Sequence, residues 1–395
     1  METWALLAAL LCGAPAWAMP AEGTPADTET PSAEPHIPHT WRLLVIPFPA
    51  GNSTDGLGFG IAADVWRRPV AWTHGYDLKI RPYAWTTING NRQSISVQVE
   101  RRGVWDLAGR IGFRRQSNLP YAGSGGGDVV FPWGDVELGN QTLGLSGFAT
   151  VSRQLNTSPW FLYLQAYVRW MDVAPGEGAL LAQREPLAEE GGTYFDVSAG
   201  LFVDHTDQWP VPTAGYMGEV DLRVGATLAN GTVSPLAGLH GELVYWWSLG
   251  SPRWVVGARA LVEHSLGERP FFEQDVTGGR LRDDLGSDQA LSGYGPGRTR
   301  GDGVVAVMVE LRPELVSFAK DNVKILLSLY AEEAFLFRAW DPGPHMPSVG
   351  VAPMGVFWRG AQLRPFIAWG WRRKEHEDDR RVALPQVGIS FVDPL

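Results

Sequence analysis

Apolar and polar residues alternate with a period of two along most of this chain, and that alternation restricts its fold more than any other feature. In the stretch 92–100, one face carries Ile95, Val97 and Val99, and the other carries only polar residues: Arg92, Ser94, Ser96, Gln98 and Glu100. The same division recurs in Trp160–Trp170, Gly218–Gly225 and Val304–Arg312. Because successive side chains of a β-strand point to opposite faces of the sheet, the pattern predicts an all-β chain.

Alternation alone also fits a soluble β-sandwich, but two details favour a transmembrane antiparallel β-barrel. The apolar faces end in tryptophan, as in the aromatic girdles of membrane barrels; these residues are Trp105, Trp160, Trp170, Trp254 and Trp371. The strands are about ten residues long, the length that a tilted membrane-crossing strand needs. We count sixteen candidate strands between Trp41 and Phe391, and bacterial barrels have an even number.

The chain divides into three expected parts. Residues 1–18 have an apolar centre and end in Ala16, Trp17 and Ala18, which is typical of a secretory signal peptide cleaved before Met19. Residues 19–40 are rich in Pro, Ala, Thr and Glu and are expected to form a disordered linker. The barrel is then 41–395, and an exported barrel is expected in the outer membrane of a bacterial cell. The net charge of −10, with no long basic tract, indicates no nucleic-acid partner.

The connections between the expected strands differ in length, and this difference predicts an orientation. The long ones follow the fifth, seventh, eleventh and fifteenth of the sixteen expected strands, and they are Arg115–Gln141, Met171–Gly192, His264–Gly303 and Arg373–Ala383. Short turns, such as Arg101–Val104 and Arg359–Gln362, follow the fourth, sixth, tenth and fourteenth. Since barrels of this kind have long outer loops and short periplasmic turns, both termini are expected in the periplasm.

The longest connection contains an unusual glycine-rich stretch, Leu291–Asp302, "LSGYGPGRTRGD", followed by the strand "GVVAVMVELR". Together with "PFFEQDVTGG" at Pro270–Gly279, this region resembles the BamA/TamA-like outer-membrane assembly barrels, also called the bacterial surface antigen domain. The resemblance is strong over Trp41–Trp66 and Pro270–Phe391 and is limited to the strand pattern between them.

The resemblance implies that the sixth outer loop folds back into the lumen of the barrel. The loop motif then comprises Leu291, Ser292, Gly293, Tyr294, Gly295, Arg298 and Arg300. The chain departs from the family pattern at Ser292, where relatives have an arginine. It also leaves no room, before the first strand, for the periplasmic polypeptide-transport-associated (POTRA) domains of most relatives.

A loop inside a barrel must approach the wall closely, and glycine permits that approach. Arginine can then pair with inward carboxylates, and we expect Glu332 and Glu310 to be these acidic partners. We expect Arg298 or Arg300 to replace the missing family arginine and to pair with Glu332. Without the resemblance, a surface loop with solvated arginines is the favoured interpretation; the resemblance reverses that preference.

The seam between the first and last strands is expected to be weak. Pro47 lies in the first strand and Pro385 at the start of the last, and proline cannot donate a hydrogen bond to a neighbouring strand. Phe391 matches the terminal aromatic residue that the assembly machinery of relatives is thought to read. Relatives are thought to open sideways at this seam, so the same opening is expected here unless the prolines merely mark strand ends.

No catalytic residue, cofactor or metal site is assigned from the sequence, and we expect no enzymatic activity. His240 and Glu242 are the nearest candidates for lumen chemistry, although a structural polar network explains them more simply. The resemblance implies a protein that assists insertion or translocation of client outer-membrane proteins with a separate periplasmic partner. Outer-membrane lipid and lipopolysaccharide are the other expected partners. A passive or plugged channel without assembly activity is the alternative.

Overall fold

The computed structural model describes most of the chain from His39 to Val392, and its account is limited to the following ranges. They are 39–52, 56–69, 76–121, 137–155, 158–175, 187–207, 211–273, 302–318, 323–338, 341–356, 362–372, 381–382 and 386–392. The expected signal peptide and nearly all of the expected linker lie outside these residues. No helix in the described ranges has the length and apolar character needed to cross a membrane.

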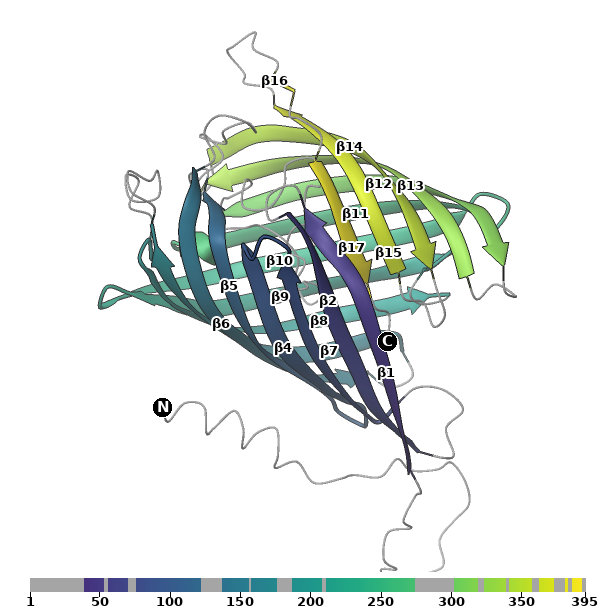
Figure 1. Ribbon diagram of the computed structural model, residues 1–395, viewed down its shortest axis with the longest axis horizontal. Coiled ribbons are helices and arrows are strands. Elements are labelled where there is room, and N and C mark those ends of the chain that lie inside the picture. The colour runs from purple at the N-terminus through teal and green to yellow at the C-terminus, as the bar shows by residue number, and fades with distance from the viewer. Residues whose placement is uncertain are drawn as a thin grey trace, which may run out of the picture.

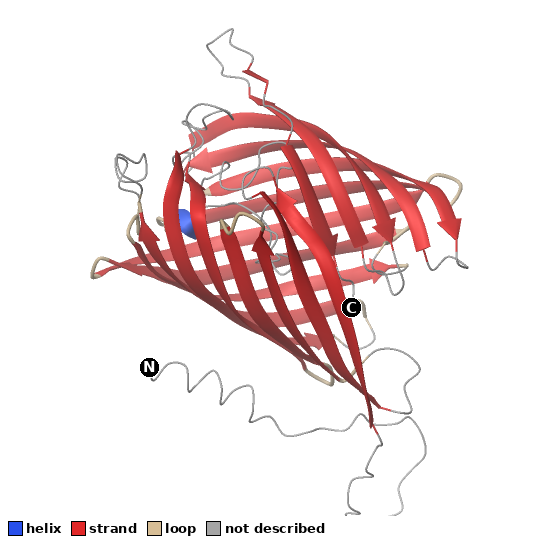
Figure 2. Cartoon of the chain, in the orientation of Figure 1, coloured by secondary structure: helices blue, strands red, loops and turns tan. Residues whose placement is uncertain are grey.

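Strands make up nearly all of the described chain, and the helical part is one short turn, η1 (Phe271–Glu273), as Figure 2 shows. The strands in chain order are β1 (His39–Asn52), β2 (Gly56–Pro69), β3 (Leu78–Thr87), β4 (Arg92–Arg101), β5 (Asp106–Tyr121), β6 (Glu137–Gln154), β7 (Trp160–Ala174), β8 (Gly191–Thr206), β9 (Gly215–Ala229), β10 (Thr232–Ser248), β11 (Trp254–Leu266), β12 (Gly303–Phe318), β13 (Val323–Arg338), β14 (Asp341–Val356), β15 (Gln362–Arg372), β16 (Arg381–Val382) and β17 (Gln386–Val392).

The strands form one antiparallel sheet in which each strand pairs with its neighbours in sequence, and the sheet closes where β1 meets β17 (Figure 1). The two-residue β16 pairs only with the end of β15, so sixteen strands make the wall. This number agrees with the count expected from the alternation. Closure gives every wall strand two neighbours, although β1 meets β17 in the described residues only at Gly51 and Asn52.

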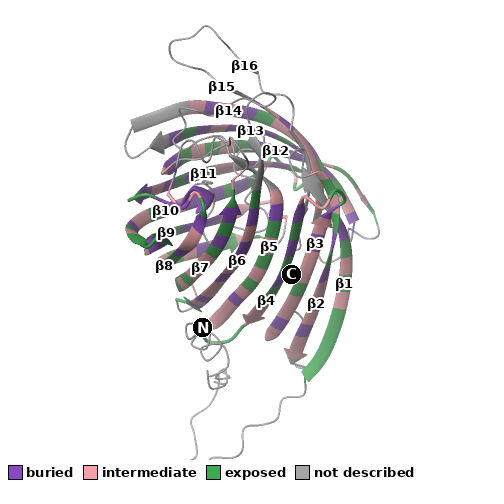
Figure 3. Ribbon diagram, turned by 60° about the vertical axis from the view of Figure 1, so that its left-hand side comes forward, coloured by how far each residue is buried: buried purple, intermediate pink, exposed green. Residues whose placement is uncertain are grey.

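Exposed and buried residues alternate along the wall strands, as Figure 3 shows. On β9, Leu222 is 66% exposed and Val220 and Val224 are exposed beside it, whereas Glu219, Asp221 and Arg223 are buried. The apolar residues therefore face outward and the polar residues face inward, the reverse of a soluble β-sandwich. This arrangement confirms the division of faces expected from the sequence, and it is the pattern of a membrane barrel.

The aromatic residues expected at strand ends lie on the outward face. Trp105, Trp160, Trp170 and Trp254 are 41–49% exposed. The side chain of Trp371 lies outside the described residues.

A tight turn joins β9 to β10 through Asn230 and Gly231, both with positive φ (50° and 73°). Such a two-residue turn matches the twist of paired strands and fixes their register.

Several strands extend beyond the expected boundaries. β5 continues to Tyr121 and β6 begins at Glu137, so part of the expected connection Arg115–Gln141 is strand. The pairing of these extensions is irregular, with register shifts after Gln116, which is why the period-two pattern did not reveal them. β1 begins at His39 rather than at the expected Trp41.

Candidate functional site in the barrel lumen

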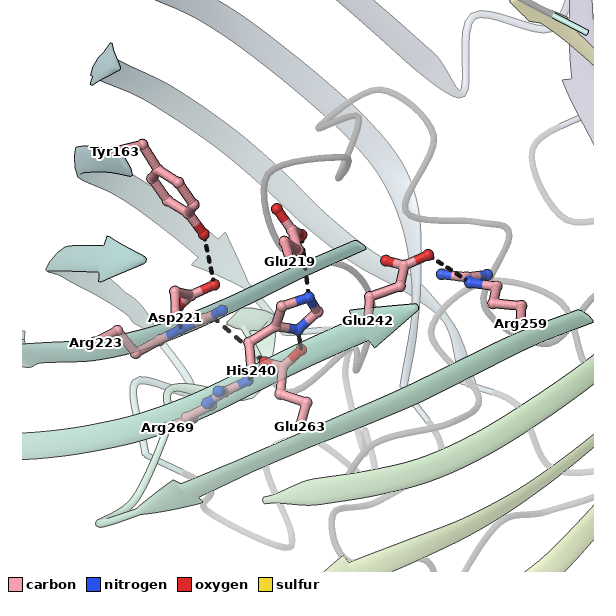
Figure 4. A network of polar contacts seen from close by, with 9 residues as sticks. All are labelled: Tyr163, Glu219, Asp221, Arg223, His240, Glu242, Arg259, Glu263 and Arg269. Atoms are coloured by element: carbon pink, nitrogen blue, oxygen red, sulfur yellow. Dashed lines mark hydrogen bonds and ion pairs between the residues drawn. The ribbon is translucent and has the colours of Figure 1, made fainter. Parts of the chain in front are cut away.

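A cluster of charged side chains lies on the inward face of three neighbouring strands, β9, β10 and β11 (Figure 4). The alternation of side chains along each strand directs these residues inward, and the register of strand pairing places them next to one another. Glu242 of β10 is directly opposite Glu219 of β9. His240 is opposite Asp221 on one side and Glu263 of β11 on the other.

His240 is at the centre of this cluster and is completely buried. Its Nε2 is 3.1 Å from Oε1 of Glu219, and its Nδ1 is 3.5 Å from Oε2 of Glu263. The ring therefore spans two carboxylates that come from different strands, as Figure 4 shows. A residue held from both sides in this way has a fixed ring orientation.

Glu263 also binds two guanidinium groups. Nη1 of Arg269 lies 2.7 Å from Oε1 of Glu263, and Nη1 of Arg223 lies 3.4 Å from the same oxygen. All three side chains are at least 90% buried. Buried charges are costly unless they are paired, so Glu263 stabilises both cations, and Asp221 supplies a second carboxylate 3.5 Å from Nε of Arg223.

Two further contacts complete the cluster. Nε of Arg259 donates to Oε1 of Glu242 at 2.7 Å. The hydroxyl of Tyr163, on β7, donates to Oδ2 of Asp221 at 3.0 Å. The nine side chains drawn in Figure 4 contain four carboxylates and three guanidinium groups, besides His240 and Tyr163. The cluster therefore has one more carboxylate than guanidinium.

The beginning of the sixth connection contacts the inner face of the wall. Phe271 and Phe272 are 0% and 3% exposed and pack on inward side chains of β7, β8, β9 and β10, including Met171, Tyr194 and Leu236. Nη1 of Arg169, on β7, lies 3.0 Å from Oε1 of Glu273. Residues Arg269–Glu273 thus lie inside the barrel, fixed by apolar packing and by ion pairs at both ends.

The predicted loop motif, Leu291 to Arg300, lies outside the described residues, and its location in the lumen stays a prediction. The predicted acidic partners are on the inward wall: Glu310 is 8% exposed and Glu332 is 7% exposed. Oγ of Ser348 donates to Oε2 of Glu332 at 2.8 Å, and Ser328 donates to Glu310. The expected pairing of Glu332 with Arg298 or Arg300 stays untested.

The seam between β1 and β17 has a short paired region among the residues that the structure describes. Its pairing in the described residues consists of Gly51 with Ile389 and Asn52 with Gly388, whereas β1 pairs with β2 along its whole length. Pro47 is outside this paired part, opposite Ile61 of β2, and it is exposed. Phe391 pairs with Leu363 of β15.

Sequence reasoning weighed His240 and Glu242 but missed Glu263, Arg269 and Glu273. The parity of β11 places Glu263 inward and could have identified it. Arg269 and Glu273 lie in a connection, where no period predicts the direction of a side chain. Their role depends on the return of the chain into the lumen.

Comparison with known proteins supports the fold. No protein-family model matches the chain, and no curated protein matches it in sequence. Among solved structures, the crystal structure of BamA from Haemophilus ducreyi lacking POTRA domains 1–3 matches with a TM-score of 0.55 and 12% identity. The match covers 90% of this chain and 71% of that one. CdiB from Acinetobacter baumannii matches with a TM-score of 0.46 and 13% identity, covering 89% of this chain and 59% of that one.

The resemblance expected from the sequence is therefore confirmed in three dimensions. Sixteen antiparallel strands form a wall with apolar residues outward and polar residues inward, and the fold matches that BamA structure over 90% of this chain. With this sheet and this match, the chain has the outer-membrane β-barrel fold of BamA.

Proposed function

We propose that this protein is a bacterial outer-membrane barrel that assists the insertion or translocation of other outer-membrane proteins, together with a separate periplasmic partner. The apolar outward face would contact lipid, and the outer rim would contact lipopolysaccharide. The observation that carries the proposal is the seam, where β1 and β17 share two residue pairs within the part of the chain that the structure describes.

A short seam lowers the cost of sideways opening because few hydrogen bonds between strands must break. Each such bond contributes about 0.5–1.5 kcal/mol net in water, and an unmade one costs several kcal/mol in lipid. An edge opened at β1 would offer unpaired backbone groups to a client strand, which could then extend the sheet.

The test is a disulfide across the seam. Cysteines would replace Gly51 and Ile389, which are directly paired, in a chain in which Ser replaces Cys12. Paired antiparallel residues have Cα atoms about 4.5–5.5 Å apart, within the range of a disulfide. A second cysteine pair at Ile61 and Ala84, opposite each other in β2 and β3, is the matched control.

Insertion of a client barrel into liposomes is the activity to measure. We expect the oxidised seam variant to lose insertion, to regain it after reduction, and the control pair to retain it in both states. Unchanged insertion by the locked seam would contradict gating, and no insertion by the wild-type barrel would contradict the assembly role.

A plugged channel is the second candidate, because Arg269–Glu273 lie in the lumen and are tied to the wall at Arg169 and Glu263. Planar-bilayer recordings separate the two functions. A large and steady conductance would favour a channel, whereas a closed barrel that inserts clients would favour the assembly role.

A further inference from the structure

Two carboxylates in the lumen face each other across neighbouring strands. Glu219 of β9 is in direct register with Glu242 of β10, and the two side chains are 6% and 7% exposed. Like charges directly opposite each other on a sheet are destabilising, and burial increases the cost. The pair therefore requires a positive charge nearby.

The positive groups beside the pair satisfy only half of its oxygen atoms. Nε of Arg259 binds Oε1 of Glu242 at 2.7 Å, and Nε2 of His240 contacts Oε1 of Glu219 at 3.1 Å. Oε2 of Glu219 and Oε2 of Glu242 are both buried, and neither has a hydrogen-bond partner among the described residues. Buried polar atoms are nearly always satisfied by protein, water or an ion, so these two oxygens indicate a bound species.

The donor atoms have the composition and spacing of a metal site. One ligand atom each from Glu219, His240 and Glu242 lie within 4.8 Å of one another. Metal bonds of about 2.0–2.1 Å place adjacent ligand atoms about 2.9–3.4 Å apart, and the Glu219–His240 separation of 3.1 Å already has that value. Small side-chain rotations would bring the Glu242 oxygen to the same spacing.

Glu263 supports the same assignment from the other side of the ring. Metal-binding histidines usually direct their second ring nitrogen at a carboxylate, which fixes the tautomer. Nδ1 of His240 is 3.5 Å from Oε2 of Glu263. Nε2 is thereby left as the nitrogen that faces Glu219.

We propose that Glu219, His240 and Glu242 form a binding site for one divalent first-row transition-metal ion on the inner wall of the barrel. Two carboxylates and one imidazole suit Zn²⁺ or Mn²⁺, whereas Mg²⁺ and Ca²⁺ prefer oxygen ligands alone. The ion would bridge β9 and β10 and neutralise the facing carboxylates. The site is independent of the proposed function in assembly, because neither the seam nor a client takes part in it.

The test uses the full-length barrel in detergent, stripped with a chelator and then titrated with Zn²⁺ alone and with Mn²⁺ alone. We expect about one Zn²⁺ per chain by calorimetry and by elemental analysis after gel filtration. Each of Glu219→Gln, His240→Gln and Glu242→Gln should weaken binding at least tenfold. His205→Gln, which replaces an exposed histidine that packs against the Tyr216 ring in a tilted arrangement, should bind as the wild type does.

A direct readout on the wild type guards against variants that fail to fold. Pulsed electron paramagnetic resonance of bound Mn²⁺ should show coupling to a directly coordinated nitrogen, and binding should release protons because the imidazole must be neutral. Absence of nitrogen coupling would overturn the assignment. The assignment would also be overturned if the wild-type protein bound less than about 0.1 Zn²⁺ per chain, or if all three variants folded and bound Zn²⁺ with the same affinity as the wild type.

Discussion

Replacing Glu263 by glutamine should destabilise the barrel strongly, because this carboxylate pairs with two buried guanidinium groups. Arg269 lies 2.7 Å and Arg223 lies 3.4 Å from its Oε1, and Glu263 is 3% exposed. Glutamine preserves the shape of the side chain but removes its charge. Arg269 and Arg223 then each lose one ion pair, although Arg223 keeps Asp221, whose Oδ1 lies 3.5 Å from its Nε. Breaking a buried pair in this way costs about 3–5 kcal/mol.

The free energy of unfolding would be measured by guanidinium titration of the barrel in detergent micelles, followed by tryptophan fluorescence. Glu268→Gln is the matched control, because Glu268 is an exposed acidic residue beside the same strand end; a surface change of this kind should alter stability by about 0.5 kcal/mol or less.

The double variant Glu263→Gln/Arg269→Met tests the cause. If the loss comes from the broken ion pair between Glu263 and Arg269, removing Arg269 as well should recover part of the stability, with a coupling energy of about 1 kcal/mol or more. The reasoning is refuted if the free energy of unfolding of Glu263→Gln is within about 1 kcal/mol of the wild-type value. It is also refuted if the destabilisation of the double variant equals the sum of the two single effects.

Two further changes test the wall. Leu222→Arg, in the middle of β9 on the outward face, should cost about 2–4 kcal/mol in a lipid vesicle, whereas Val233→Arg, at the beginning of β10, should cost about 0–1 kcal/mol. Equal losses from the two changes would contradict a lipid-facing wall. Gly200→Ala should cost about 1–3 kcal/mol by the same titration, because an added Cβ would lie 2.4 Å from a backbone oxygen and 2.9 Å from the Tyr163 ring. Gly144→Ala, where the nearest atom is 3.4 Å away, is the control, and a similar effect of both changes would disprove close approach at Gly200.

The sequence by itself determined the number of wall strands and the direction of most of their side chains. The alternation in 92–100 placed Ile95 outward and Ser96 inward, and the structure has them so. This prediction succeeds because side-chain direction along a strand is a local property with a period of two. The irregular ends of β5 and β6 escaped it because register shifts interrupt that period.

Only the tertiary structure decided which inward residues meet. The alternation of side chains along β10 places His240 in the lumen, but its contacts with Glu219 and Glu263 depend on the relative register of β9, β10 and β11. Register is set by turn geometry and by the ladder of hydrogen bonds between strands, which no single strand encodes. Arg269 joins them because the chain after β11 returns into the lumen, where Phe271 packs against the wall. Periodicity assigns each residue a face, and the closure of the sheet gives it its neighbours.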